Sequence, residues 1–255
     1  MKYLYAPGCA LMSYKPHLAD KLKEIIESRY GKVDTILECC FTRPFLENGT
    51  HIITPCVTCA SKYANIYPNC HVEFFLDVLA ESNNFIFPDY GGLKMSIQDT
   101  CSSRSMPETQ ATIRRLLERM NITLVEPERS GIKAKCCGQI LYGKTDIDKV
   151  KSFMIGRASE MPCNDVVVYC SSCIMSMTQG GKQPRYILDL IFGERTELKD
   201  NIETWNAKLT DFRKTLNPQL HSRSATYIKR NGLLIRKITI KSSRPFQCAY
   251  HPLTP

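Results

Sequence analysis

Apolar positions along the chain alternate between short continuous runs and helical stripes. Residues 2–5 form a short run, and residues 17–29 carry apolar side chains at helical spacing along one face. The same order returns later, with a run at residues 94–99 and a second stripe at residues 107–120. Pro107 suits the first turn of a helix, because its fixed backbone angle is already helical. The pattern predicts a strand followed by a helix, twice.

Further elements continue this repeat in both halves. The pattern predicts second strands at 33–37 and 122–125, third strands at 51–54 and 166–169, and closing helices at 72–79 and 186–192. Alternating strands and helices are typical of parallel sheets. The predicted fold class is therefore α/β, with two tandem pseudo-repeated Rossmann-like βαβ units, short parallel sheets and a basic C-terminal extension.

The two halves differ in one connection. A further helix is predicted at residues 146–161, between the second and third strands of the second half. The corresponding gap between cysteines is 15 residues in the first half against 32 in the second. This difference is about one short helix with its turn, so the first half is expected to lack this crossover helix. The predicted domains are residues 1–93, 94–199 and 200–255.

Ten of the 13 cysteines form two copies of one pattern, a single Cys, an adjacent pair and a Cys-x-x-Cys. The first set is Cys9, Cys39, Cys40, Cys56 and Cys59; the second set is Cys101, Cys136, Cys137, Cys170 and Cys173. In each set the cysteines follow predicted strands. Sites in parallel sheets gather at the carboxyl ends of strands, so the thiols of each set are expected to converge. Cys70, Cys163 and Cys248 have no counterparts and are expected to be small buried apolar residues.

The cysteines and the positive charge lie in different parts of the chain. Net charge is +9, but residues 200–255 hold 10 Lys and Arg against 3 Asp and Glu. Within them, residues 201–216 predict a helix, and Asn231-Gly232 predicts a hairpin between residues 226–230 and 233–240. A surface for an acidic partner or a solvated edge is favoured over nucleic acid, which is not an expected partner.

Thiolates are soft ligands that select zinc, copper(I) or iron–sulfur clusters. No apolar stretch reaches the roughly 18 residues of a membrane helix, and the first residues carry no export signal. A cytoplasmic location is therefore expected, where dense cysteines indicate metal binding or redox chemistry more than disulfides. Five thiols exceed the four ligands of structural zinc, and adjacent cysteines favour an iron–sulfur cluster.

The order single Cys, Cys-Cys-Gly and Cys-x-x-Cys resembles the cysteine-rich "CCG" domain family. Two tandem copies over residues 1–195 resemble the heterodisulfide reductase B subunits within it. This resemblance implies up to two [4Fe-4S] clusters, of noncubane type, one in each cysteine set. It also implies reduction of a small disulfide, with electrons from a ferredoxin-like iron–sulfur subunit fed by a flavoprotein. Gly138 matches the family's glycine after the cysteine pair, where the backbone approaches the cluster.

The first copy departs from the family pattern, because Phe41 replaces the glycine and the loop to Cys56 is short. A cluster, zinc or a partly empty site all stay open for it. The predicted function is an iron–sulfur oxidoreductase subunit that acts on a sulfur group within a complex. The open alternatives are an electron relay without its own substrate, a zinc-stabilised scaffold, and a thiol–disulfide oxidoreductase that uses a Cys-x-x-Cys directly.

Other residues near the cysteines receive plainer interpretations. Arg43 and Arg104 are expected to be solvated surface charges, and His51 is expected to be structural. Turn chemistry suffices for the serines beside the cysteines, although serine hydroxyls can also donate to cluster sulfurs. No G-x-G-x-x-G follows a predicted strand, so neither nicotinamide nor flavin is expected in this chain.

Overall fold

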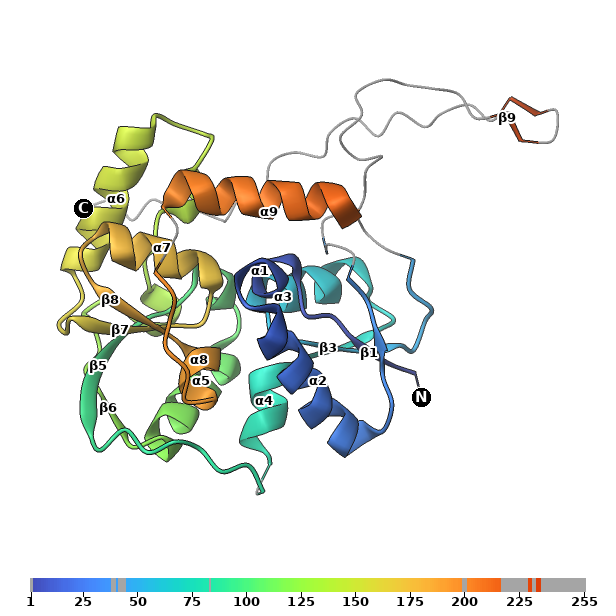
Figure 1. Ribbon diagram of the computed structural model, residues 1–255, viewed down its shortest axis with the longest axis horizontal. Coiled ribbons are helices and arrows are strands. Elements are labelled where there is room, and N and C mark those ends of the chain that lie inside the picture. Colours follow the sequence, from blue (N-terminus) through green and yellow to red (C-terminus); the bar gives the residue numbers. More distant parts are fainter. Residues whose placement is uncertain are drawn as a thin grey trace.

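Two four-stranded, all-parallel sheets form the framework of the protein (Figure 1). The computed structural model describes residues 2–37, 40, 45–82, 84–198 and 201–216, and the backbone of 229–230 and 233–234. The first sheet has the order β2 (Asp34–Thr35), β1 (Tyr3–Tyr5), β3 (His51–Thr54), β4 (His71–Phe74), and the second has the order β6 (Ile122–Leu124), β5 (Leu93–Gln98), β7 (Asp165–Val168), β8 (Gln183–Tyr186). The predicted α/β class with two Rossmann-like units is confirmed.

Helices connect the strands in both halves. They are α1 (Cys9–Tyr14), α2 (Pro16–Tyr30), α3 (Val57–Ile66) and α4 (Phe75–Ala80), then α5 (Pro107–Arg119), α6 (Ile147–Ser159), α7 (Ser171–Gln179) and α8 (Ile187–Ile191). Short 3-10 turns lie at Cys101–Ser103, Gly131–Lys133 and Gln139–Leu141. The predicted stripe of α2 is buried through Leu18, Leu22 and Ile26. Burial of each such side chain stabilises the fold by about 1.5–3 kcal/mol.

A fourth strand in each sheet was not predicted. The expected helices at 72–79 and 186–192 were wrong in their first residues, because His71–Phe74 and Gln183–Tyr186 are strands. Only the second part of each apolar run is helical, as α4 and α8. Short apolar runs fit both periods. Pairing with a neighbouring strand decides between them here, since Val72 lies opposite Ile52 of β3. The helices α3 and α7, which follow the two Cys-x-x-Cys motifs, were also missed.

The connection between β6 and β7 contains a helix that the described part of the connection between β2 and β3 lacks, as expected. In the second half, α6 crosses from β6 to β7, and the Asp146 carboxylate caps it by accepting from the Asp148 N–H at 2.9 Å. In the first half, the described residues between β2 and β3 contain no helix.

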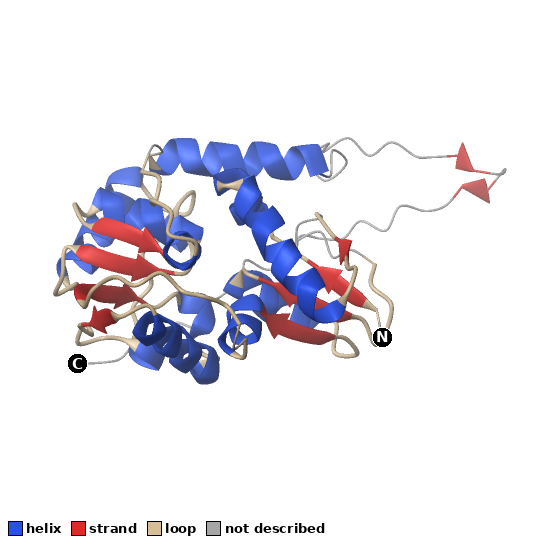
Figure 2. Cartoon of the chain, turned by 60° about the horizontal axis from the view of Figure 1, so that its bottom comes forward, coloured by secondary structure: helices blue, strands red, loops and turns tan. Residues whose placement is uncertain are grey.

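The two halves share one core and are bridged by α9 (Ile202–Leu216). A buried ion pair joins them, since Lys15 Nζ lies 2.7 Å from Asp189 Oδ1. Figure 2 shows the two sheets side by side, with α9 lying across both halves. Trp205 of α9 is buried and donates from Nε1 to Ser172 Oγ at 3.1 Å. The range of α9 confirms the helix predicted at 201–216.

Part of the hairpin predicted for the C-terminal extension lies within the described residues. Strands β9 (Lys229–Arg230) and β10 (Leu233–Leu234) are antiparallel, with Leu233 opposite Arg230. The rest of the predicted hairpin and Cys248 lie outside the described residues. Within the described residues, no helix has both the length and the apolar character needed to cross a membrane.

Candidate functional site

The cysteines of the first set lie at the carboxyl edge of the first sheet. Cys9 begins α1 just beyond β1, and Cys56 precedes α3 just beyond β3. In the order β2-β1-β3-β4 these two strands are neighbours, and their connections leave in opposite directions. This reversal is where parallel sheets form their binding crevices. Gly8 has a φ of 81°, which allows the chain to turn tightly into Cys9.

Three thiols of the first set are in direct contact. Cys59 Sγ donates to Cys40 Sγ at 3.4 Å and is also hydrogen-bonded to Cys56. These two hydrogen bonds and burial raise the pKa of Cys59. Cys9 lines the same cavity but contacts Arg213, whose Nε donates to Cys9 Sγ at 3.4 Å. Cys39 lies outside the described residues.

All five thiols of the second set form one unbroken row. Cys136 interacts with Cys101 and Cys137, and Cys173 interacts with Cys137 and Cys170, closely enough to shift their pKa values. Cys101 follows β5 and Cys170 follows β7, which are again neighbouring strands. The convergence expected from the sequence is therefore present in the second half.

Hydrogen bonds give the thiols of this row very different acidities. Donation from Cys101 and Cys137 lowers the pKa of Cys136, and the Gly138 N–H adds a hydrogen bond of 3.4 Å to Cys136 Sγ. The hydrogen bond from Cys173 and the backbone N–H groups at the start of α7 lower the pKa of Cys170 to about 7. The lowered pKa values favour the thiolate, the form that binds metal, at Cys136 and Cys170.

Two features require a glycine at position 138: the local backbone conformation and the close packing of this loop on α6. Its φ is 94°, and a Cβ at this position would lie 3.0 Å from Met154 Cγ and 3.1 Å from Phe153 Cδ1. The loop with the cysteine pair thus packs tightly on α6. Approach of this glycine to a cluster stays a prediction.

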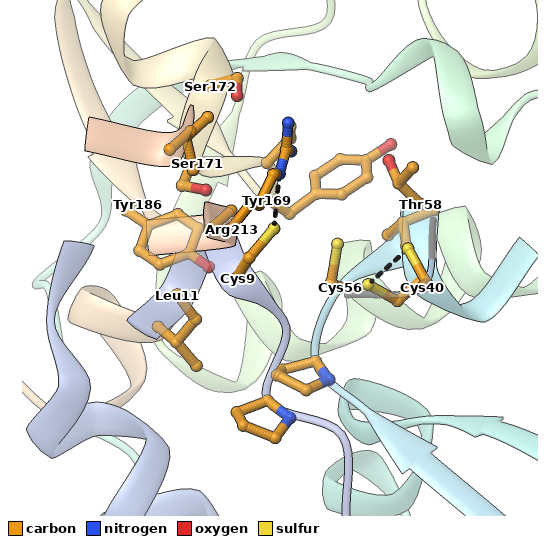
Figure 3. Close-up of a pocket in the computed structure, with 17 residues that line it drawn as sticks. Cys9, Leu11, Cys40, Cys56, Thr58, Tyr169, Ser171, Ser172, Tyr186 and Arg213 are labelled. Carbon is orange, nitrogen blue, oxygen red and sulfur yellow. Dashed lines mark hydrogen bonds between the residues drawn. The ribbon is translucent and has the colours of Figure 1, made fainter. Parts of the chain in front are cut away.

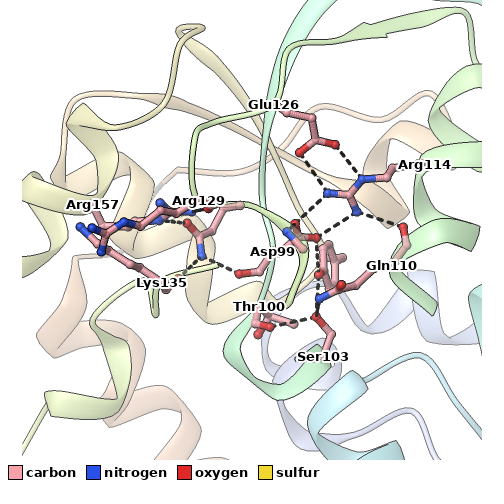
Figure 4. A network of polar contacts seen from close by, with 12 residues as sticks. Asp99, Thr100, Ser103, Gln110, Arg114, Glu126, Arg129, Lys135 and Arg157 are labelled. Atoms are coloured by element: carbon pink, nitrogen blue, oxygen red, sulfur yellow. Dashed lines mark hydrogen bonds and ion pairs between the residues drawn. The ribbon is translucent and has the colours of Figure 1, made fainter. Parts of the chain in front are cut away.

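A buried polar network holds the loop that carries Cys136 and Cys137 (Figure 4). Asp99, fully buried, accepts from Arg114 Nη2 at 2.8 Å and from the Gly131 N–H at 2.6 Å. Tyr169 Oη also donates to Asp99, at 2.7 Å. The loop is thereby fixed to the strand end that leads into Cys101.

Two further side chains bind carbonyl oxygens of the same loop. Gln98 Nε2 donates to the Lys135 oxygen at 3.0 Å, and Arg104 Nε donates to the Ala134 oxygen at 2.8 Å. The expectation that Arg104 is a solvated charge was wrong, because its guanidinium fixes the residues just before Cys136. Arg43 lies outside the described residues.

A cavity of about 180 Å³ between the halves is lined by cysteines of the first set and by one cysteine of the second (Figure 3). Four described thiols of the first set line one side, and Cys170 with Tyr169 and Tyr186 lines the other. Leu209 and Arg213 of α9 complete the lining. The sequence placed no functional residue in this helix, and no local signal marks Arg213, because its role depends on how α9 crosses the halves.

The remaining described cysteines and two polar residues predicted near the thiols lie as follows. Cys70 and Cys163 are half-buried, so the expectation of full burial was wrong. Ser102 Oγ lies 2.8 Å from Thr58 Oγ1 and so joins the two halves. His51 is the first residue of β3, at the opposite end of this strand from the thiols.

Searches with protein-family models and against curated proteins found no match to this chain.

Proposed function

We propose that this chain is an iron–sulfur oxidoreductase subunit that reduces a disulfide in the cavity between its two cysteine sets. The observation that carries the proposal is the unbroken row of five thiols in the second half, which ends with Cys170 at that cavity. The second set would hold a [4Fe-4S] cluster, and the first set would hold a second cluster or zinc.

The arrangement of the sulfurs fits a group with several metal atoms better than a single ion. A tetrahedral zinc ion holds its sulfur ligands about 3.8 Å apart. In the second set the contacts link the sulfurs one after another, from Cys101 through Cys136, Cys137 and Cys173 to Cys170, and not around one centre. A row of thiols, with thiolates favoured at Cys136 and Cys170, suits a larger cluster. A cluster bound there would supply single electrons.

The cavity has the properties that a disulfide site needs. Pro7, Leu11, Pro55 and Leu209 give it apolar walls that exclude water. Burial raises the pKa of Tyr186, so its hydroxyl stays protonated and can donate a hydrogen bond. Arg213 provides a positive charge for an anionic substrate. Reduction of one disulfide to two thiols takes two electrons and two protons, and a partner iron–sulfur protein would deliver the electrons one at a time.

Metal analysis of the full chain, purified without oxygen, tests this proposal. We expect about four or about eight iron atoms per chain with equal acid-labile sulfide, and reduction of small disulfides with a one-electron donor. Cys136→Ser should remove about four iron atoms and the activity. Cys163→Ser, outside both sets, should keep both. Zinc without sulfide would refute the proposal.

A second candidate is direct thiol–disulfide exchange by Cys170 and Cys173. The pKa of Cys170, about 7, and its place before α7 and at the cavity favour it. The Cys170 thiolate would attack the substrate disulfide and release one thiol. Cys173 would then displace the second thiol and leave a Cys170–Cys173 disulfide, which an external thiol must reduce. Activity of metal-free protein, retained in Cys101→Ser, would favour this candidate over the cluster.

A further inference from the structure

A cluster of two histidines and one glutamate lies towards the amino ends of β3 and β4, whereas the thiols lie beyond the carboxyl ends of the strands. His51 and His71 are directly opposite each other in β3 and β4, and Glu73 follows two residues later on the same face. One ligand atom from each side chain lies within 4.8 Å of the others, and no other such group of His, Cys, Asp or Glu occurs among the described residues.

We propose that His51, His71 and Glu73 bind a divalent transition-metal ion of the zinc class. Two imidazoles and one carboxylate are a donor set that zinc accepts, with water in the fourth position. This site is independent of the proposed redox function, because its residues belong to neither cysteine set.

The distances leave little rearrangement for binding. Zinc–ligand bonds of about 2.05 Å at tetrahedral angles place the ligand atoms about 3.3 Å apart. His51 Nε2 and Glu73 Oε2 are already 2.8 Å apart, and no separation in the group exceeds 4.8 Å. Closing the remaining gap falls to His71, whose side chain is exposed and therefore free to change its torsion angles.

Neighbouring aromatic residues hold two of the ligands in place. Tyr3 stacks on His51 with ring centroids 4.8 Å apart, and Tyr30 stacks on Tyr3 at 4.6 Å. Tyr30 Oη donates to Glu73 Oε2 at 3.4 Å. Such outer contacts orient the ligands of metal sites and raise affinity.

The local charge also favours a cation. Tyr30 is the last residue of α2, a helix of 15 residues, and the carbonyl end of a helix carries partial negative charge. The adjacent Arg29 interacts with Glu73 through its charge alone, since its guanidinium hydrogen bonds go to Glu81 at 2.7 Å and to the Val78 oxygen at 3.0 Å. Exposed His71 leaves the site open to solvent, so an ion can enter.

Zinc titration of the full chain, as purified, tests the site by equilibrium dialysis and elemental analysis. We expect the unaltered protein to bind about one more zinc ion than His71→Ala or Glu73→Gln. His71 is exposed and Glu73→Gln keeps its shape, so both variants should fold. His17→Gln is the matched control, because His17 is an exposed histidine bound to Glu194 elsewhere. It should keep the additional ion.

Cobalt(II) separates this site from the thiols. The ion lost in His71→Ala should show ligand-field absorption without thiolate-to-cobalt charge transfer. Equal zinc content in all variants, or a lost ion with thiolate charge transfer, would overturn the proposal. Melting temperature adds a second measure, since zinc should raise it more in the unaltered protein and in His17→Gln than in His71→Ala.

Discussion

Substitution of Gly138 tests how the cysteine pair is positioned. Gly138→Ala places a side chain at a φ of 94°, which costs an L-residue about 1–2 kcal/mol. The new Cβ also lies 3.0 Å from Met154 Cγ, and Met154 is fully buried, so it can yield only by disturbing α6. We expect a total loss of about 2 kcal/mol, which lowers the melting temperature by roughly 4–8 °C.

The same loss should reach the metal site, because the Gly138 N–H donates to Cys136 Sγ. Thermal unfolding followed by circular dichroism, together with iron analysis, gives both quantities. Gly156→Ala, within α6, is the matched control. Gly156 is exposed, lies inside α6 and has no atom within 4 Å of its Cβ position, so alanine should stabilise the protein by about 1 kcal/mol. Equal melting temperatures for the two variants would refute the reasoning.

Two further predictions concern charge. Arg213→Gln should raise the ratio of KM for an anionic disulfide to KM for a neutral disulfide about tenfold, because one charged contact contributes about 1.5 kcal/mol. Lys214 is exposed on the same helix, so Lys214→Gln should leave this ratio unchanged in steady-state kinetics. Burial raises the pKa of Glu194, but hydrogen bonds from Lys21, His17 and Lys15 outweigh it and lower the pKa to about 2. Stability from this carboxylate should therefore be present above pH 4.5, the pKa of an unperturbed glutamate, and be lost as pH falls towards 2. Urea unfolding at several pH values should show a shallower loss for Glu194→Gln, and a parallel loss in both proteins would contradict the assignment.

Local sequence carried enough information for most of the strands and helices and for the convergence of the second thiol set. The apolar face of a helix such as α2 is formed by residues three and four positions apart in the sequence, so periodicity alone predicts it. Cys101 and Cys170 follow apolar runs that end as strands, and parallel strands bring their carboxyl ends together. Residues 72–74 and 183–186 were missed as strands because a short apolar run becomes a strand only through the neighbour it pairs with.

Only the tertiary structure decided which surfaces of the two halves meet. Arg213 reaches Cys9 across 204 positions of the sequence, and no local pattern encodes such a contact. His51 and Glu73 likewise come together through the register of β3 and β4. The sequence by itself determined the repeat, the α/β class and the thiols that converge in the second half. The cavity between the cysteine sets, its closure by α9 and the histidine–glutamate cluster required long-range packing, because burial of apolar surface decides which faces pack together.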